Sequence, residues 1–234
     1  MATPVRTSNK SFGALLVIVA IVGVAVLGYV TSRPTKALTL DPAAAAGLSA
    51  AGIVIGSPDA PIEVTEFADF ECPACGYFAT LQEPYIRERL VQTGEIRFRF
   101  LDFPLDIHRN AVAAHNAAQC ANEQGKFWEM HDAIYANQER WNGQATGDPR
   151  KVLREIAGTA GLDEASFTEC YDSGRMLPQI AANRAAGERL QVRSTPSFQI
   201  GDQLISGALT YDQMKEAVAA EKARRDSART GATR

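Results

Sequence analysis

Residues 62–75 read IEVTEFADFECPAC, and this stretch decides the fold that the sequence predicts. Its first part, residues 62–67, is rich in β-branched and aromatic side chains, which is typical of a strand. Apolar side chains recur at near-helical intervals after the second cysteine, so we predict a helix over Tyr77–Gln92. Cys72 and Cys75 therefore lie at the junction between a strand and a helix.

The position of Cys72 at the start of a helix changes the chemistry of its thiol. The positive end of the helix dipole and the free N–H groups of the first turn stabilise a thiolate over a thiol. A thiolate is the attacking species in disulfide exchange, and a thiolate of low pKa is a good leaving group. Cys75 is placed where it can attack a mixed disulfide on Cys72, and Pro73 suits the first turn because its missing N–H would be unpaired there. The motif indicates a redox-active pair; half of a zinc site and an inert structural bridge are the alternatives.

Glu66 lies on the predicted strand, shortly before the motif. If its carboxyl group is buried, desolvation raises its pKa, and the group could relay a proton to or from Cys75. A solvent-facing glutamate on the same strand is the other interpretation, and the strand pattern alone does not decide between them.

The rest of the chain predicts an α/β domain that is interrupted by helices. Residues 95–103 alternate apolar and polar side chains, which indicates a half-buried strand. Helical patterns then occupy residues 110–123, 126–137, a segment opened by Asp148-Pro149, 163–172 and 175–190. Residues 197–200 and 203–206 predict a hairpin, and Thr210 begins a last helix that ends at about Arg225. This order, β-α-β, a helical block and β-β-α, predicts one sheet with helices on both faces.

Three segments of the chain carry a resemblance to a known family: EFADFECPAC at residues 66–75, QGKFW at 124–128 and TPSF at 195–198. With them the chain resembles the DsbA-like branch of the thioredoxin superfamily, thiol:disulfide oxidoreductases of the bacterial cell envelope. The resemblance covers roughly Gly52–Arg225 and implies an α/β, thioredoxin-like fold with an inserted helical subdomain. We therefore expect this domain over residues 53–226, with the insertion over about residues 108–190.

The resemblance also implies roles for single residues. Cys72 would be the exposed nucleophile and Cys75 the buried resolving cysteine. Pro196 would be a cis-proline beside the active site, and the backbone of Thr195 would then face Cys72 and offer pairing groups to an extended substrate segment. Glu66 stands at the position of the family's buried acid.

One residue of the motif departs from many DsbA-like oxidases. They have a histidine or an aromatic residue just before the second cysteine, whereas this chain has Ala74. Alanine cannot donate a hydrogen bond or a charge to the thiolate, so we expect the helix terminus to be the main cause of a lowered Cys72 pKa. The direction of net electron flow is left open.

Cys120 and Cys170 form a second candidate pair within the predicted helical block. A disulfide between them would close a loop of about 50 residues, which the chain-entropy account values at roughly 4 kcal/mol. We expect a structural disulfide, in keeping with an oxidising compartment. A second redox relay and two free buried thiols are the alternatives.

The three histidines, His108, His115 and His131, show no spacing typical of a zinc-binding helix. We predict no metal site and no bound cofactor, since the cysteine pair itself would carry the electrons. His115 and His131 fit packing or helix-surface positions, and His108 could lie near the rim of the active site.

The N-terminal stretch at residues 12–30, FGALLVIVAIVGVAVLGYV, contains no charged side chain. As a helix it would be about 28 Å long, close to the ~30 Å hydrocarbon core of a bilayer, and it lacks the polar stripe of a core helix. We predict one transmembrane anchor, with a cytoplasmic head over residues 1–11, a linker over residues 31–52 and, at the other end, a flexible tail over residues 227–234. A cleaved signal peptide and a buried helix are the alternatives.

The distribution of charge argues against one class of function, nucleic-acid binding, and the N-terminal segment predicts where the domain is located. The chain of 234 residues has a net charge of −3, and its first 36 residues carry only basic charge, so the remainder is acidic and unsuited to nucleic acid. A domain with four cysteines behind one anchor is expected on the extracytoplasmic, periplasmic side of the cell membrane.

The sequence therefore predicts a membrane-anchored thiol:disulfide oxidoreductase, with disulfide formation in exported proteins as the favoured direction. The expected partners are exported proteins with cysteines and a membrane redox partner that reoxidises the pair. An extracytoplasmic reductase or isomerase is the first alternative. A non-catalytic metal-binding module, with the four cysteines on one ion, is the second.

Overall fold

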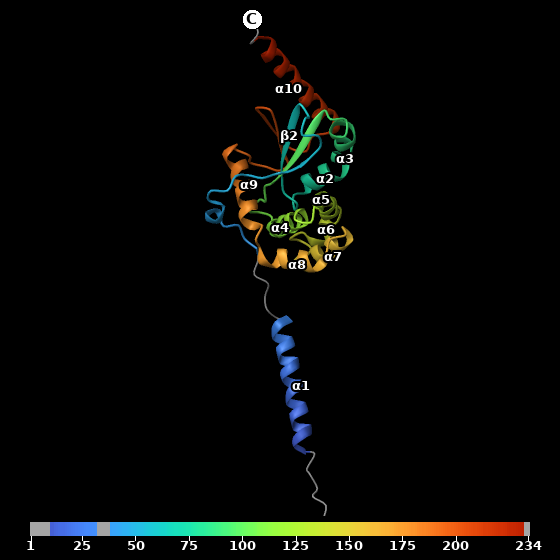
Figure 1. The fold of residues 1–234 in the computed structure, drawn as a ribbon, viewed down its shortest axis with the longest axis vertical. Helices are drawn as coiled ribbons and strands as arrows, with labels where there is room; N and C mark the ends of the chain where they lie inside the picture. The colour runs from blue at the N-terminus through green and yellow to red at the C-terminus, as the bar shows by residue number, and fades with distance from the viewer. Residues whose placement is uncertain (1–9, 32–37, 232–234) are drawn as a thin grey trace, which may run out of the picture. The chain divides into compact units, whose positions relative to one another are not determined.

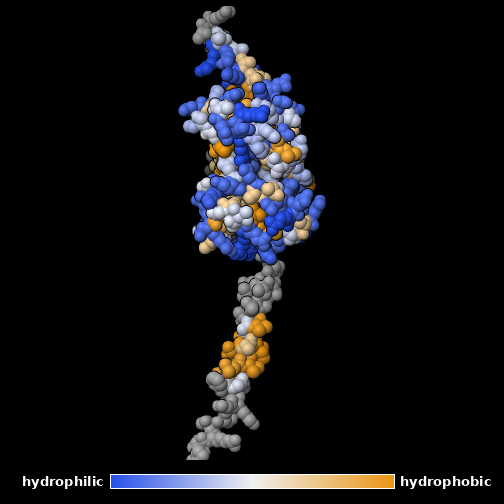
Figure 2. Space-filling view, turned by 90° about the vertical axis from the view of Figure 1, so that its right-hand side faces the viewer, coloured by the Kyte–Doolittle hydropathy of each residue, from blue (hydrophilic) through white to orange (hydrophobic). Residues whose placement is uncertain are grey.

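The computed structural model describes residues 10–31 and 38–231, and the chain divides into two units, residues 1–36 and 37–234 (Figure 1). The first unit contributes helix α1, Lys10–Thr31, which includes the helix expected over residues 12–30. The side chains of residues 15–22 are apolar and exposed, and they belong to the orange surface of this helix in Figure 2. Across the described ranges, no helix combines the length and the hydropathy needed to cross a membrane.

The second unit is built on a five-stranded sheet in the order β1-β3-β2-β4-β5. The strands are β1 Ile53–Ile55, β2 Ile62–Ala68, β3 Ile96–Asp102, β4 Ser197–Ile200 and β5 Gln203–Ser206. β2 and β3 are parallel, and the other neighbouring strands are antiparallel. β2 is central and buried on both faces, because helices cover both sides of the sheet.

Each face of the sheet has its own helical layer. On one face α2 (Pro73–Leu81), α3 (Glu83–Ile86), the π-helical turn η2 (Arg87–Val91) and α10 (Tyr211–Gly231) cover an apolar core that includes Val64, Phe98 and Phe198. On the other face α9 (Leu177–Arg189) lies close to Phe67 and Phe103. Gly187 permits this approach, since a Cβ atom there would meet the Phe103 ring at 2.7 Å.

A helical insertion follows β3, as the sequence predicted, but it ends before α9 and not at about residue 190, because α9 packs on the sheet. Its helices are α4 (Ala111–Asn122), α5 (Phe127–Ala136), α6 (Gln138–Trp141), α7 (Arg150–Thr159) and α8 (Glu164–Ser173). They gather below the sheet in Figure 1, and Phe70 and Phe100 join their core to the ends of the central strands. The expected disulfide between Cys120 and Cys170 is confirmed: it links α4 to α8 with a Cα–Cα distance of 5.7 Å.

The helix predicted over Tyr77–Gln92 is wrong in its bounds. It begins earlier, at Pro73, and it breaks at Gln82 into α2, α3 and η2. Pro84 stands just after this break, and a proline cannot donate the backbone hydrogen bond that a continuous helix would need.

The linker and tail predictions also need correction. Residues 38–52, expected in a linker over 31–52, belong to the folded unit: Asp41 caps the short 3₁₀ helix η1 (Pro42–Ala45), and the Asn183 amide on α9 bonds to both backbone groups of Ala51. Residues 227–231, expected in the tail, continue α10, because alanine and arginine favour helix.

Strand β1 was not predicted, since three residues give too short a pattern. Residues 1–9, 32–37 and 232–234 lie outside the described residues, and with them most of the predicted head.

Candidate active site

The cysteine motif lies at the turn between β2 and α2. Cys72 has extended backbone angles (φ −69°, ψ 123°) and precedes the first helical residue, Pro73. The Cys72 N–H donates to the Asp69 carbonyl at 3.1 Å, and the Cys72 carbonyl accepts from Gly76 at 3.0 Å. The predicted placement of the motif between a strand and a helix is confirmed.

Cys72 has the environment of a stabilised thiolate. Its pKa is lowered to about 5, chiefly by a hydrogen bond from the Cys75 thiol, against the opposing effect of burial. The Thr195 side chain and the backbone N–H groups of Ala74 and Cys75 lower it further. The expectation that the helix terminus is the main cause is therefore wrong, because the hydrogen bond with the Cys75 thiol lowers the Cys72 pKa more than the backbone N–H groups of the first turn do.

The exposed position that the resemblance implied for Cys72 also needs correction. The residue is only 7% exposed. Its sulfur lies 3.3 Å from the Thr195 carbonyl oxygen, so the loop before β4 covers it.

Cys75 has the opposite environment. It is fully buried, and its sulfur accepts a hydrogen bond from the Asp69 N–H at 3.5 Å. Burial raises the pKa of its thiol well above the ordinary value, and the charges of Cys72 and Glu66 add to this. The two sulfurs thus differ strongly in acidity, as a nucleophile and a resolving cysteine require.

Thr195 and Pro196 lie where the resemblance placed them. The peptide bond between them is cis, and the Thr195 carbonyl faces Cys72. The Pro196 carbonyl accepts from the Gly207 N–H at 2.8 Å, which holds the loop to the end of the hairpin.

Glu66 is buried, 2% exposed, so the solvent-facing interpretation is wrong. In the sheet it is opposite Phe100 on one side and Phe198 on the other. Burial, followed by the charge of Glu83, raises the pKa of its carboxyl group well above the ordinary value. The charge of Cys72 also raises this pKa, which places the Glu66 carboxyl group close to the cysteine pair.

Two acids that the sequence reasoning missed hold the turn before Cys72. Asp69 accepts from the N–H groups of Glu71 and Leu105, at 2.8 and 2.7 Å. Glu71 accepts from the N–H groups of Asn110 and Gly143, both at 2.5 Å. Two acids in a turn next to reactive cysteines were a usable signal, but Leu105, Asn110 and Gly143 lie 36 or more residues away and could not be read from the sequence as their partners.

The histidines take two kinds of position. His108 lies next to the site, with its Nδ1 atom 2.7 Å from Asp69 Oδ2, and this hydrogen bond raises its pKa. His115 is buried, with Nδ1 2.6 Å from Asp102, while its Nε2 accepts from the Phe70 N–H at 3.5 Å. His131 is buried among aromatic rings.

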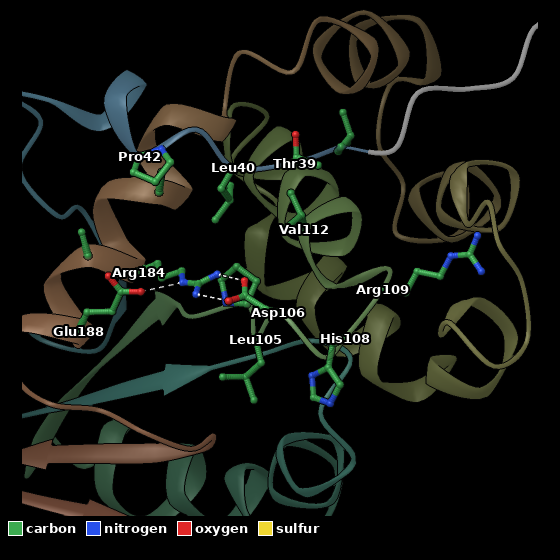
Figure 3. Close-up of a pocket in the computed structure, with 14 residues that line it drawn as sticks. Thr39, Leu40, Pro42, Leu105, Asp106, His108, Arg109, Val112, Arg184 and Glu188 are labelled. Carbon is green, nitrogen blue, oxygen red and sulfur yellow. Dashed lines mark hydrogen bonds and ion pairs between the residues drawn. The ribbon is translucent and has the colours of Figure 1, made fainter.

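A cavity of about 440 Å³ adjoins the site on the side of α9 (Figure 3). His108 lines it, so the cavity reaches the Asp69 side of the motif. The ion pair between Arg184 and Asp106 crosses its wall, and Leu40, Leu105 and Val112 supply apolar lining. The cavity therefore has a mixed apolar and charged lining, and neither the cysteine pair nor the loop at Thr195–Pro196 contributes to it.

Within residues 10–31 and 38–231, no group of three or more His, Cys, Asp or Glu side chains is arranged to hold a metal ion. The disulfide between Cys120 and Cys170 removes two of the four thiols. The alternative in which four cysteines bind one ion is therefore wrong.

A central strand that leads into a turn with two cysteines, and a cis-proline loop that faces the first of them, define a thioredoxin-fold protein with a dithiol site. The family model described as Thioredoxin matches residues 49–220. The chain belongs to the thioredoxin family.

Known proteins extend this comparison. The Na(+)/H(+) antiporter NhaA 3 of Salinispora tropica is 36% identical over 166 residues, which are 70% of this chain but 24% of the antiporter, so the chain spans only that part of this relative. Disulfide bond formation protein D of Bacillus subtilis is 24% identical over 174 residues, covering 72% of this chain and 76% of that protein. The crystal structure of oxidised BdbD from Bacillus subtilis superposes with a TM-score of 0.65 at 20% identity, over 81% of this chain and 98% of that one. The resemblance to the DsbA-like branch is confirmed.

Proposed function

We propose that this chain is a thiol:disulfide oxidoreductase that transfers a Cys72–Cys75 disulfide to exported proteins. The observation that carries the proposal is the contrast between the two sulfurs. Cys72 has a pKa lowered to about 5, whereas burial raises the pKa of Cys75. Because Cys75 is fully buried, Cys72 is the sulfur that a substrate thiolate can reach, and its low pKa lets it leave as a stable thiolate when the mixed disulfide is resolved.

The reaction follows from this contrast. A substrate thiolate attacks Cys72, forms a mixed disulfide and displaces Cys75 as a thiolate. Cys75 then takes a proton from the Glu66 carboxyl group, since both are buried and both hold protons tightly. A second substrate thiolate attacks the first substrate sulfur and releases Cys72 as a thiolate. The substrate is oxidised by two electrons, and the enzyme pair is reduced by the same two.

The Thr195 carbonyl and the neighbouring backbone would hold an extended substrate segment beside Cys72. No cofactor is needed, because the cysteines carry the electrons. Reoxidation requires a partner that accepts them, and we propose a membrane redox protein for this role.

Disulfide formation is the favoured direction, because a low Cys72 pKa stabilises the reduced pair and so makes its disulfide a stronger oxidant. Reduction or isomerisation uses the same chemistry in reverse. A strongly negative reduction potential would select those activities instead.

We also propose that α1 anchors the domain on the extracytoplasmic side of the cell membrane. The uncharged run at residues 12–30 and the exposed apolar side chains at residues 15–22 support this assignment. An anchored chain would stay in the membrane fraction after an alkaline wash and keep its N-terminus, whereas a cleaved signal peptide would leave a shorter chain in the wash.

Oxidation of a peptide by the full chain, with its cysteine pair first oxidised, tests the function. The wild type should oxidise a reduced peptide with two cysteines, and Cys72→Ser should not. Cys75→Ser, offered the same peptide in its disulfide form, should accumulate the mixed disulfide through Cys72, because no second enzyme thiol can resolve it. Equal oxidation by Cys72→Ser and the wild type would show that the mechanism is wrong.

A further inference from the structure

A second group of buried titratable side chains lies on the same side of the sheet as Glu66. Glu83 on α3 is 1% exposed, and His131 on α5 is 0% exposed. Their facing atoms, Glu83 Oε2 and His131 Nε2, are 3.7 Å apart. Neither atom has a hydrogen-bond partner among the described residues, and the same is true of Glu66 Oε2. Buried polar atoms are rarely left unpaired, so three together call for a role.

The sheet register places Glu66 toward this group. Glu66 is directly opposite Phe100, and residues paired across strands direct their side chains to the same face. The Phe100 ring is 5.3 Å from the His131 ring, centroid to centroid. The charge of Glu83 is the second cause of the raised Glu66 pKa, in keeping with this placement of the two carboxyl groups.

The group reaches solvent at Asp132. His131 Nδ1 is 2.8 Å from Asp132 Oδ1, and the Asp132 side chain is 56% exposed. Arg87 holds the two acids on either side of the histidine, 2.6 Å from Glu83 and 3.0 Å from Asp132. The charged or titratable neighbours are thus Glu66 on β2, Glu83 and Arg87 on α3 and η2, Asp132 and Tyr135 on α5, and the two cysteines.

We propose that Glu83 and His131 form a proton path between Glu66 and the surface at Asp132. This inference rests on the proposed function, because the path serves the proton that Cys75 gains and loses. Glu83 and His131 do not touch the reacting sulfurs. They are positioning residues that act through Glu66, because they return a proton to its carboxyl group.

The transfer is balanced and reversible. When Cys75 is oxidised, its proton passes through Glu66 and Glu83 to His131 Nε2, and the ring releases its Nδ1 proton to Asp132 and water. The ring is then protonated on Nε2. When Cys75 is reduced, Nε2 returns that proton toward Glu66, and Nδ1 recovers one from Asp132. Alternate turnover thus resets the imidazole without a ring flip, and a small rotation or one water molecule closes the 3.7 Å gap.

The test follows reduction of the oxidised full chain by dithiothreitol at several pH values, in ordinary and in heavy water. The wild type should show a solvent isotope effect on the formation of the Cys75 thiol. Glu83→Gln and His131→Gln should slow this step about tenfold and change its pH profile. Glu88→Gln is the matched control, because Glu88 is exposed on η2 and loses the same charge.

The outcomes separate the two proposals. Wild-type rates, pH profile and isotope effect in both Glu83→Gln and His131→Gln would overturn the proton path while leaving the oxidoreductase intact. If either variant does not fold, the wild type alone decides. The absence of a solvent isotope effect on formation of its Cys75 thiol would overturn the proton path. A wild-type chain that never exchanges with dithiothreitol or with a reduced peptide would instead overturn the proposed function.

Discussion

The Cys72 sulfur lies 3.3 Å from the main-chain oxygen of Thr195, a residue 123 positions further along the chain. The site is therefore assembled from two ends of the thioredoxin domain, the turn after β2 and the loop before β4. The whole helical insertion lies between them in sequence. Correct folding of the sheet is thus a precondition for the reactivity of Cys72.

The acidity of Cys72 should depend on its neighbouring thiol. Cys75→Ala removes the hydrogen bond that contributes most to the low pKa, so the Cys72 pKa should rise clearly from about 5. Cys75→Ser keeps a hydroxyl donor and should raise it less. The rate of alkylation of Cys72 against pH measures both values, and an unchanged profile in Cys75→Ala would contradict this cause.

Burial of Glu66 should make its replacement stabilising at neutral pH. Its folded pKa is raised, so the folded state binds the proton more tightly, and stability falls as pH rises from the unfolded pKa toward the folded one. Glu66→Gln removes this loss and should raise the free energy of unfolding by about 1–3 kcal/mol at pH 8, with little effect at pH 4. Urea unfolding at the two pH values checks the sign, and a constant difference would rule out the linkage. The same variant should slow protonation of Cys75.

His108 should contribute stability at low pH only. Its hydrogen bond to Asp69 raises its folded pKa, so the contribution is complete below the unfolded pKa and is lost as pH rises through the folded one. Because the side chain is partly exposed, screening limits the effect of His108→Gln to about 0.5–1 kcal/mol at pH 5.5, vanishing near pH 9. Thermal or urea unfolding of both proteins measures it; an equal loss at the two pH values would point to packing instead.

The Cys120–Cys170 disulfide should stabilise the fold without taking part in exchange. Both cysteines are almost fully buried, and the bond closes a separation of 50 residues. Replacing both by alanine should lower the free energy of unfolding by about 4 kcal/mol. At temperatures below the unfolding transition, the rate of thiol exchange at Cys72 should stay the same. A folded double variant with much slower substrate oxidation would revive the second-relay interpretation.

Local patterns were enough to predict the main elements and the reactive pair. β2, β4, β5 and the longer helices of the insertion follow from short-range periodicity and capping residues, whereas the four-residue helix α6 was not predicted. Cys72 and Cys75 follow from their place between a strand and a helix. The burial of Glu66 was not predictable in this way, because a central strand is covered on both faces and shows no alternation. The Pro84 break was readable in the sequence and was overlooked.

The remaining features depend on contacts between distant segments. Asp69 bonds to Leu105, 36 residues away, and Glu71 to Gly143, 72 residues away, so neither local periodicity nor spacing could reveal them. The effect of Cys75 on the Cys72 pKa depends on the relative orientation of two thiols, which a sequence does not contain. The cis form of the Thr195–Pro196 bond was expected from resemblance alone.

The bonds of Phe70 and Glu71 to the insertion have a mechanical consequence. Through them the turn ahead of Cys72 is tied to His115, Asn110 and Gly143, while Asp69 is tied to Leu105 just before the insertion. The insertion therefore supports the turn that carries the sulfur, most closely through the two 2.5 Å hydrogen bonds of Glu71. Removal of the insertion would therefore break three of the hydrogen bonds that hold this turn in place.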